Sequence, residues 1–384
     1  MSSRIALFLL CAFAHFNAVA ATLSVGPNGT HQRISDAARD ARDGDTVEIA
    51  EGEYRGDAAI WTQGRLTIRG LGKGATLIAD GAIAEGKAVW VIRSGEFDIG
   101  NITFRGARAP DNNGAGIRFE HGLLRVANCR FFDNQNGILT SNDKASELIV
   151  TNSEFGDSPH SERGLPHLLY VGQIARLEVT GSNFYKGWKG HLLKSRARES
   201  VVKYNKIYDG SDGAASYELE FPVGGQAVVV GNIIGQSRDT QNSSIVAYGA
   251  EGRQWPENGL YLSHNTLVNN LPRGGYFLRV WREKFGDDLN LVALNNLLIG
   301  NGEFNVADEA LTGNVRLRLG QSGAPVPPDF RLAADSPLRG KIFKGAATPF
   351  GDLAPQEEFT PPSGVRPLAA PARAPGAVQT PARQ

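Results

Sequence analysis

NITF (101–104) is the first of eight related phrases in this sequence, each of which ends in a large apolar residue. The other seven are NCRF (128–131), NSEF (152–155), GSNF (181–184), YNKI (204–207), GNII (231–234), HNTL (264–267) and NNLL (295–298). From Phe104 to Leu298, the apolar ends of successive phrases lie 27, 24, 29, 23, 27, 33 and 31 residues apart. Self-similarity at this period indicates a solenoid of stacked structural repeats.

The residues around the phrases favour strands over helices. Runs such as LRVANCRF (124–131) and ARLEVTGSNF (175–184) alternate apolar and polar residues and are broken by glycine, asparagine and aspartate. A second run follows most phrases, as in GILT (137–140), HLLKS (191–195) and SIVAY (244–248). Two or three short strands in about 25 residues match one coil of a parallel β-helix. We therefore predict an all-β fold, a right-handed parallel β-helix solenoid.

Asparagine is frequent in the phrases, and we predict that its role there is structural. Its side chain tolerates the left-handed backbone conformation that sharp turns need. Stacked side-chain amides in neighbouring coils can also bond each other as a ladder. We expect the phrase asparagines to serve turns and a ladder rather than catalysis.

The two ends of the chain are predicted to differ from the repeats. Residues 1–20 carry Arg4, an apolar run and a small-x-small ending, which is typical of a secretory signal peptide. We therefore expect an exported protein, periplasmic or secreted, with no transmembrane segment in the mature chain. The spacing of apolar residues in 31–42 predicts a short helix that caps the stack. A β-helix domain over 21–353 is followed by 354–384, whose proline and alanine content predicts a disordered tail.

Composition narrows the expected partners. The 40 basic and 40 acidic residues balance, so the sequence lacks the basic excess that nucleic-acid binding requires. One continuous solenoid core makes a single domain the economical reading of 384 residues, and we expect a monomer. Once the signal peptide is removed, Cys129 is the remaining cysteine, which excludes an internal disulfide.

Several segments resemble the right-handed parallel β-helix proteins of the pectin-lyase-like superfamily. They are the opening GDTVEIAEGEYRG (44–56), the ladder of phrases and the ending SPLRG (336–340), and the resemblance covers about residues 23–340. It implies a protein that binds or degrades acidic polysaccharides. Within that superfamily, HLLKSRARESVVKYNKI (191–207) is similar to a segment of chondroitinase-B and alginate-lyase type enzymes. That likeness implies that Lys194 serves as the base, assisted by an arginine from the following coil.

In this chain the following coil offers two glutamates instead, and alternation along the strands predicts where they point. If Lys194 and Arg196 face outward, the same alternation in the next coil turns Tyr217 inward. Glu218 and Glu220 then face outward, about 5 Å from their neighbours in the adjacent coils. We expect these four charged residues to form one stacked row.

Such a row could support β-elimination. In that reaction a base removes the proton next to a uronate carboxylate, and a positive or hydrogen-bonding group stabilises the developing enolate. Lys194 is the candidate base, and Arg196 is the positive neighbour that would help it to lose its proton. Glu218 and Glu220 could bind the substrate or a Ca²⁺ ion, since hard cations favour oxygen ligands, although the sequence requires no cofactor. A solvated salt-bridge network is the alternative interpretation of these residues.

Further residues extend the candidate site. His191 and His167 begin corresponding strands one coil apart, where an imidazole could transfer a proton or simply bond a turn. Tyr248 could donate a proton, and Arg279 could extend the charged face two coils further. Trp255 lies in the insertion that produces the longest spacing, and its ring could stack on a sugar. Core or rim packing is the alternative for the two aromatic residues.

Three functional classes remain open at this point. The first is an exported β-helix protein that acts on a uronate-containing polysaccharide, with β-elimination as the candidate reaction. The second is a noncatalytic glycan-binding protein, which needs a groove but no proton transfer. The third is a structural or adhesive solenoid. Whether the charged residues line a groove discriminates between them.

Overall fold

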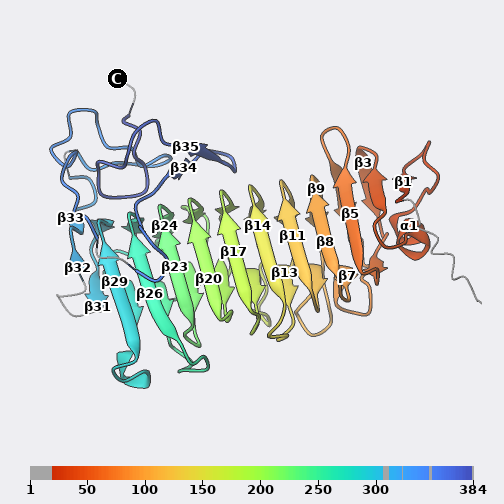
Figure 1. Ribbon diagram of the computed structural model, residues 1–384, viewed down its shortest axis with the longest axis horizontal. Helices are drawn as coiled ribbons and strands as arrows, with labels where there is room; N and C mark the ends of the chain where they lie inside the picture. The colour runs from red at the N-terminus through yellow and green to blue at the C-terminus, as the bar shows by residue number, and fades with distance from the viewer. Residues whose placement is uncertain (1–19, 306–310, 322, 346–347, 383–384) are drawn as a thin grey trace, which may run out of the picture.

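The computed structural model describes residues 20–305, 311–321, 323–345 and 348–382 (Figure 1). The predicted signal peptide, apart from Ala20, lies outside the described residues. The described chain winds into an elongated solenoid of parallel strands, with the N-terminal helix at one end. This is the predicted all-β parallel β-helix.

Each full coil contributes one strand to each of three parallel sheets. Sheet A consists of β1 (Thr22–Val25), β2 (Thr46–Ile49), β5 (Arg65–Gly70), β8 (Glu96–Gly100), β11 (Leu123–Ala127), β14 (Glu147–Thr151), β17 (Arg176–Thr180), β20 (Glu199–Lys203), β23 (Gln226–Val230), β26 (Asn258–Ser263), β29 (Leu289–Leu294) and β32 (Leu311–Thr312). Sheet B consists of β3 (Gly52–Arg55), β6 (Ala75–Ile78), β9 (Ile102–Arg105), β12 (Arg130–Phe132), β15 (Glu154–Gly156), β18 (Asn183–Phe184), β21 (Lys206–Tyr208), β24 (Ile233–Gln236), β27 (Thr266–Asn269), β30 (Leu297–Gly300) and β33 (Val315–Leu317). Sheet C consists of β4 (Ala59–Trp61), β7 (Ala88–Ile92), β10 (Ala115–Phe119), β13 (Asn136–Thr140), β16 (His167–Val171), β19 (Leu193–Ser195), β22 (Leu219–Phe221), β25 (Ser244–Tyr248), β28 (Tyr276–Val280) and β31 (Glu303–Asn305).

The core is a continuous column of apolar side chains, which the coils stack in register. The first four phrase endings, Phe104, Phe131, Phe155 and Phe184, stack ring on ring with successive centroids 5.1, 4.7 and 4.7 Å apart. The last four endings are buried aliphatic residues: Ile207, Ile234, Leu267 and Leu298. Each fully buried side chain of this size stabilises the fold by roughly 1.5–3 kcal/mol. The sequence period therefore corresponds to one coil.

The phrases form the turn between sheet A and sheet B, and the predicted roles of asparagine are confirmed there. The first residue of every phrase has a positive φ, between 48° at Asn152 and 66° at Gly231. The second residue points inward from the fifth phrase onward and forms an amide ladder. The Oδ1 of Asn232 accepts hydrogen bonds from the backbone N and the Nδ2 of Asn205, at 2.9 and 3.0 Å. Asn265 continues the same pattern in the next coil.

The predicted capping helix is confirmed as α1 (Ile34–Asp40) at the N-terminal end of the stack (Figure 1). Ile34, Ala37 and Ala38 are buried against the first coils. The carboxylate of Asp57 accepts the backbone N–H groups of Ile34 and Ser35, at 2.6 and 3.1 Å, which satisfies two donors of the helix N-terminus. A short 3₁₀ helix, η1 (Arg282–Lys284), follows strand β28 of sheet C near the other end of the stack. Among the described residues, no helix has the length and apolar character that crossing a membrane demands.

The C-terminal segment is ordered along the solenoid, which differs from the disordered tail that its composition predicts. β34 (Glu357–Phe359) and β35 (Val365–Pro367) form an antiparallel hairpin beside the phrase turns (Figure 1). The hydroxyl oxygen of Tyr204 accepts the N–H of Gln356 at 3.0 Å, and the N–H of Gly364 donates to the carbonyl of Gly181 at 2.7 Å. The predicted boundary at 353 therefore does not separate an ordered domain from a loose tail.

The physical reason is that this segment covers apolar surface supplied by the coils. Ala374, Ala377 and Val378 are buried against a cluster that includes Ile233 and Leu297. Composition counts the apolar side chains of the segment itself and misses the surface on which they pack. A buried carboxylate also fixes the segment, because Glu358 accepts the N–H groups of Gln379 and Thr380 at 2.7 and 2.9 Å and pairs with Arg366.

Candidate functional site

Sheet C presents one row of outward positions that the coils hold in register. Leu169 and Leu193 in adjacent strands are fully buried, so the residues that follow them face away from the core. We call these positions the outer row of sheet C. In chain order the outer row is Val91, Arg118, Leu139, Tyr170, Lys194, Glu220, Ala247 and Arg279.

Lys194 lies in an ion-pair cluster in the middle of the outer row. Its Nζ is 3.3 Å from Oε2 of Glu220 and 3.1 Å from Oε1 of Glu251, and 11% of its side chain is exposed. The ring of Tyr170 flanks the ammonium group at 5.8 Å. Two carboxylates therefore share the one ammonium group of Lys194.

Arg196 shares one of these carboxylates. Its Nε and Nη2 lie 3.0 and 2.7 Å from Oε2 of Glu251, and its Nη1 donates to the hydroxyl of Tyr170. Burial would lower the pKa of Arg196, but Glu251 and Tyr170 together outweigh it and raise the pKa. The paired arrangement predicted as an alternative therefore exists here, although its cations are mostly covered.

His191 and Glu220 form a buried pair next to Lys194. Nδ1 of His191 is 3.0 Å from Oε2 of Glu220, and the backbone N–H of His191 donates to Nδ1 of His167 at 2.9 Å. Burial lowers the pKa of both imidazoles, and for His191 the contact with Glu220 opposes this shift. Burial would also raise the pKa of Glu220, but His191 and Lys194 hold it below its usual value. The 3.0 Å contact lacks hydrogen-bond geometry, so Nδ1 of His191 and Oε2 of Glu220 have no hydrogen-bond partner within the described residues. A neutral His191 with its proton on Nδ1 keeps a free lone pair on Nε2.

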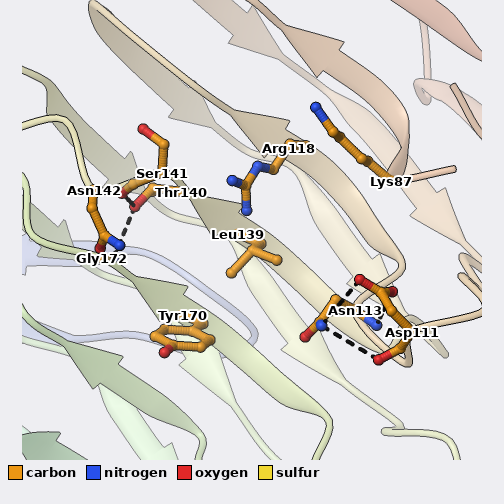
Figure 2. Close-up of a pocket in the computed structure, with 10 residues that line it drawn as sticks. All are labelled: Lys87, Asp111, Asn113, Arg118, Leu139, Thr140, Ser141, Asn142, Tyr170 and Gly172. Carbon is orange, nitrogen blue, oxygen red and sulfur yellow. Dashed lines mark hydrogen bonds between the residues drawn. The ribbon is translucent and has the colours of Figure 1, made fainter. Parts of the chain in front are cut away.

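A pocket of about 410 Å³ opens on the N-terminal part of the outer row (Figure 2). Arg118, Leu139 and Tyr170 line it from three successive coils, and Lys87 lies at its edge. The guanidinium of Arg118 makes no side-chain hydrogen bond within the described chain, and its buried Nε lies 3.9 Å from Oε1 of Glu120. Burial lowers the pKa of Arg118, although Glu120 and Asp111 oppose the shift. Arg118 is thus a charged group of the outer row that lacks a hydrogen-bond partner within the described residues.

The comparisons with known proteins agree with this architecture. The profile described as "Right handed beta helix region" matches residues 87–281, just over half of the chain. The chain belongs to the right-handed β-helix family. A solved structure titled "Crystal structure of pectate lyase Pel9A" is similar, with a TM-score of 0.54 and 13% identity over 88% of this chain and 96% of that chain. The search of curated proteins finds no match. The likeness to the pectate lyase structure shows a shared fold.

In this β-helix, Tyr217 and Glu218 lie on the sides opposite to those predicted. Glu218 is fully buried, and it occupies the position that the core residue Leu192 has in the preceding coil. The ring of Tyr217 lies 5.0 Å from the ring of His191, outside the core. The chain bends before β22, so the simple alternation of sides fails at this point. Burial, aided by Asp209, raises the pKa of Glu218 well above its usual value. Both carboxylate oxygens lack a hydrogen-bond partner within the described residues.

The two glutamates therefore do not form the Ca²⁺ site that the sequence suggested. Glu218 points into the core, and the carboxylate of Glu220 contacts Lys194 and His191. Within the described residues, no group of three or more histidine, cysteine, aspartate or glutamate side chains is placed to hold a metal ion. The donor set at this position does not fit a hard cation.

The aromatic residues predicted to touch a substrate serve mainly in packing. Tyr248 is fully buried in the core, and its hydroxyl donates to the carbonyl of Gly225 at 2.6 Å, so the predicted substrate contact is wrong. Trp255 is 7% exposed, and its Nε1 donates to the carbonyl of Arg196 at 3.0 Å. Arg279 lies two coils beyond Glu220 in the outer row, where its Cζ is 4.5 Å from the ring of Trp281.

Sequence reasoning missed Glu251 and Arg118. Glu251 comes from the loop between β25 and β26, and its ion pairs depend on how that loop folds back, which no local pattern reveals. Arg118 had a usable signal, because AGIRF (115–119) aligns with HLLKS (191–195) three coils later. Extending the alignment of repeats toward the N-terminus would have placed Arg118 in the same row as Lys194.

Proposed function

We propose that the outer row of sheet C binds an acidic, uronate-containing polysaccharide. The observation that carries this proposal is the partly buried guanidinium of Arg118, which lines a pocket and forms no side-chain hydrogen bond within the described chain. Arginine remains charged in proteins and presents a planar fork of donors that matches a carboxylate. A polar group buried without a partner is costly, so a ligand carboxylate would supply a missing interaction.

The surroundings of Arg118 suit a sugar chain. Tyr170 and Leu139 offer apolar surface in adjacent coils, and Lys87 lies at the pocket edge, where its ammonium group pairs with Glu120 at 2.8 Å. Outward positions repeat at about 4.8 Å along the solenoid, which favours an extended polymer over a compact ligand. The fold shared with a protein titled as a pectate lyase supports the same substrate class. Export and a monomeric state stay predictions from the sequence.

Cleavage by β-elimination is a second candidate function, favoured by the buried pair of His191 and Glu220. In this step Nε2 of His191 would take the proton next to a uronate carboxylate, and the carboxylate of Glu220, with Oε2 3.0 Å from Nδ1, would stabilise the positive charge on the imidazole. The released electron pair would form the carbon–carbon double bond as the glycosidic C–O bond breaks. The leaving oxygen would take a proton from the hydroxyl of Tyr170 or from water. The pairing of Lys194 with two carboxylates makes it a binding charge in this scheme, so His191 replaces it as the proposed base.

The test measures binding and turnover by the full chain with a panel of polysaccharides. Polygalacturonate, alginate and chondroitin are each titrated beside neutral dextran, at low and at high salt. We expect binding of at least one acidic polymer, weakened by salt because charges dominate, and no binding of dextran. Ultraviolet absorbance of an unsaturated product would establish the lyase activity. Binding without such a product would support glycan binding without cleavage. Equal affinity for acidic and neutral polymers would contradict the proposal.

A further inference from the structure

The loop between β25 and β26 (residues 249–257) covers the two cations in the middle of the outer row. Its Glu251 contacts both of them, with Oε1 3.1 Å from Nζ of Lys194 and Oε2 2.7 Å from Nη2 of Arg196. The side chain of Glu251 is 39% exposed, whereas those of Lys194 and Arg196 are 11% and 16% exposed. The carboxylate therefore lies on the solvent side of the cations, as a lid does.

Backbone bonds also hold this loop against sheet C. The N–H of Glu251 donates to the carbonyl of Pro222 at 2.7 Å, and the N–H of Gln254 donates to the carbonyl of Val223 at 3.0 Å. The side chains of Gln254 and Gln173 bond each other, and Lys284 donates to the carbonyl of Ala250. Trp255 anchors the far end of the loop through its bond to the carbonyl of Arg196. Gly252, with a φ of 91°, follows Glu251, and no atom lies within 4 Å of the place where a side chain would begin. Opening of the tip would break the ion pairs of Glu251 and its backbone bond to Pro222, with Trp255 as the fixed end of the loop.

The charges beneath the loop define what could replace Glu251. Lys194 and Arg196 carry two positive charges, which Glu220 and Glu251 balance with two negative ones. Removal of Glu251 alone leaves one excess positive charge, which matches one carboxylate of a ligand. Tyr170 joins this position to the Arg118 pocket, because it lines that pocket and its hydroxyl accepts a hydrogen bond from Arg196.

We propose that Glu251 occupies the position of a sugar carboxylate, and that an acidic glycan bound at Arg118 displaces it as the loop tip opens. This inference rests on the proposed function, since it assumes that the outer row receives a uronate chain. Arg118 and Lys194 are three coils apart, about 14 Å along the axis, so a short oligosaccharide can reach both. Binding then needs the open loop, and the closed loop lowers the apparent affinity.

The experiment compares Glu251→Gln with wild type, using oligogalacturonate, oligoalginate and chondroitin oligosaccharides as separate probes. Glutamine keeps the size of the side chain and removes the charge that holds the cations. We expect affinity for the acidic probe to rise about tenfold, as when an open state of about a tenth becomes dominant. Glu257→Gln is the matched control, because Glu257 is an exposed glutamate of the same loop. Gln254→Ala, which releases the bond to Gln173, should shift affinity in the same direction.

The outcomes separate two claims: that Glu251 blocks the site until it is displaced, which we call the gate, and that the outer row binds an acidic glycan. If wild type binds a probe and Arg118→Ala loses it, while Glu251→Gln and Gln254→Ala bind no tighter, the gate is wrong and the binding face stands. Weaker binding by Glu251→Gln would also overturn the gate, because the carboxylate would then assist the ligand. If Glu251→Gln binds a probe that wild type does not bind, the gate is supported. No binding by any variant would overturn both proposals.

Discussion

The amide ladder in the interior and the outer row of sheet C are both stacks of polar side chains, one per coil, but they differ in how their groups are satisfied. In the ladder, each asparagine oxygen accepts bonds from the preceding coil, as Asn232 does from Asn205. In the outer row, Arg118 makes no side-chain hydrogen bond within the described chain. A row that satisfies itself supports the fold, whereas a row with an open donor offers that donor to a ligand.

Glu218 is an exception among the interior polar groups. It is an interior polar group, yet both of its carboxylate oxygens lack partners within the described residues. Its high pKa allows it to stay protonated and uncharged in the core, which avoids the larger cost of a buried charge. An unsatisfied group therefore indicates a ligand only when a pocket gives access to it, as at Arg118.

The C-terminal segment makes its polar and apolar contacts within the molecule, and its removal should have the largest effect on stability. A variant that ends at residue 353 loses Phe359 and Val378, which are buried, so unfolding should become easier by about 4 kcal/mol. Urea denaturation followed by circular dichroism measures the change, with glycan affinity determined in parallel. An unchanged midpoint would mean that the segment adds nothing to the stability of the coils.

Breaking the amide ladder should have the second largest effect on stability. Asn232→Ala leaves the backbone N–H of Asn205 and the carbonyl of Val202 without their partners, so the free energy of unfolding should fall by about 3 kcal/mol. Affinity for an acidic glycan should not change, since the ladder lies away from sheet C. Asn290→Ala, at an exposed asparagine of sheet A, is the control and should stay within about 0.5 kcal/mol. Equal effects of the two substitutions would remove the distinction between ladder and surface.

Glu218 predicts an effect of pH on stability that is smaller than these two for each pH unit. Its carboxyl has a raised pKa in the folded state, so as the pH rises above about 4.3 the unfolded chain loses this proton first and stability falls. Asp209, with a pKa raised by burial to about 6, acts in the same direction. Relative to wild type, Glu218→Gln should gain about 1.4 kcal/mol of stability per pH unit above pH 5, until the folded pKa is reached. Parallel stability curves from pH 5 to 8 would show that Glu218 does not titrate as proposed.

Most of the fold could be predicted from the sequence because one period governs every coil. The phrase endings, the turns with positive φ and the amide ladder all follow from residues that recur at the same place, such as Asn232 and Asn265. Alternation also placed Lys194 outside, next to Glu220 of the following strand. These inferences need only that neighbouring coils are equivalent.

The remaining site depends on places where the coils are not equivalent. The bend before β22 exchanges the sides of Tyr217 and Glu218, and the alternation pattern contains no sign of it. Glu251 reaches Lys194 from a loop whose path is set by tertiary contacts. Tyr248 aligns with Phe221 in the inward row, so register could have excluded it as a surface residue. The C-terminal segment was misjudged because its partner surface belongs to the coils.

The most direct measurement of the central claim is the affinity of Arg118→Ala for an acidic oligosaccharide that wild type binds, by isothermal titration calorimetry. Loss of a charge-assisted pair should weaken binding about tenfold, with stability unchanged. Arg105→Ala, at an exposed arginine of sheet B, should bind as wild type does. If Arg118→Ala keeps full affinity, or if Arg105→Ala loses as much, the outer row of sheet C is not the binding face.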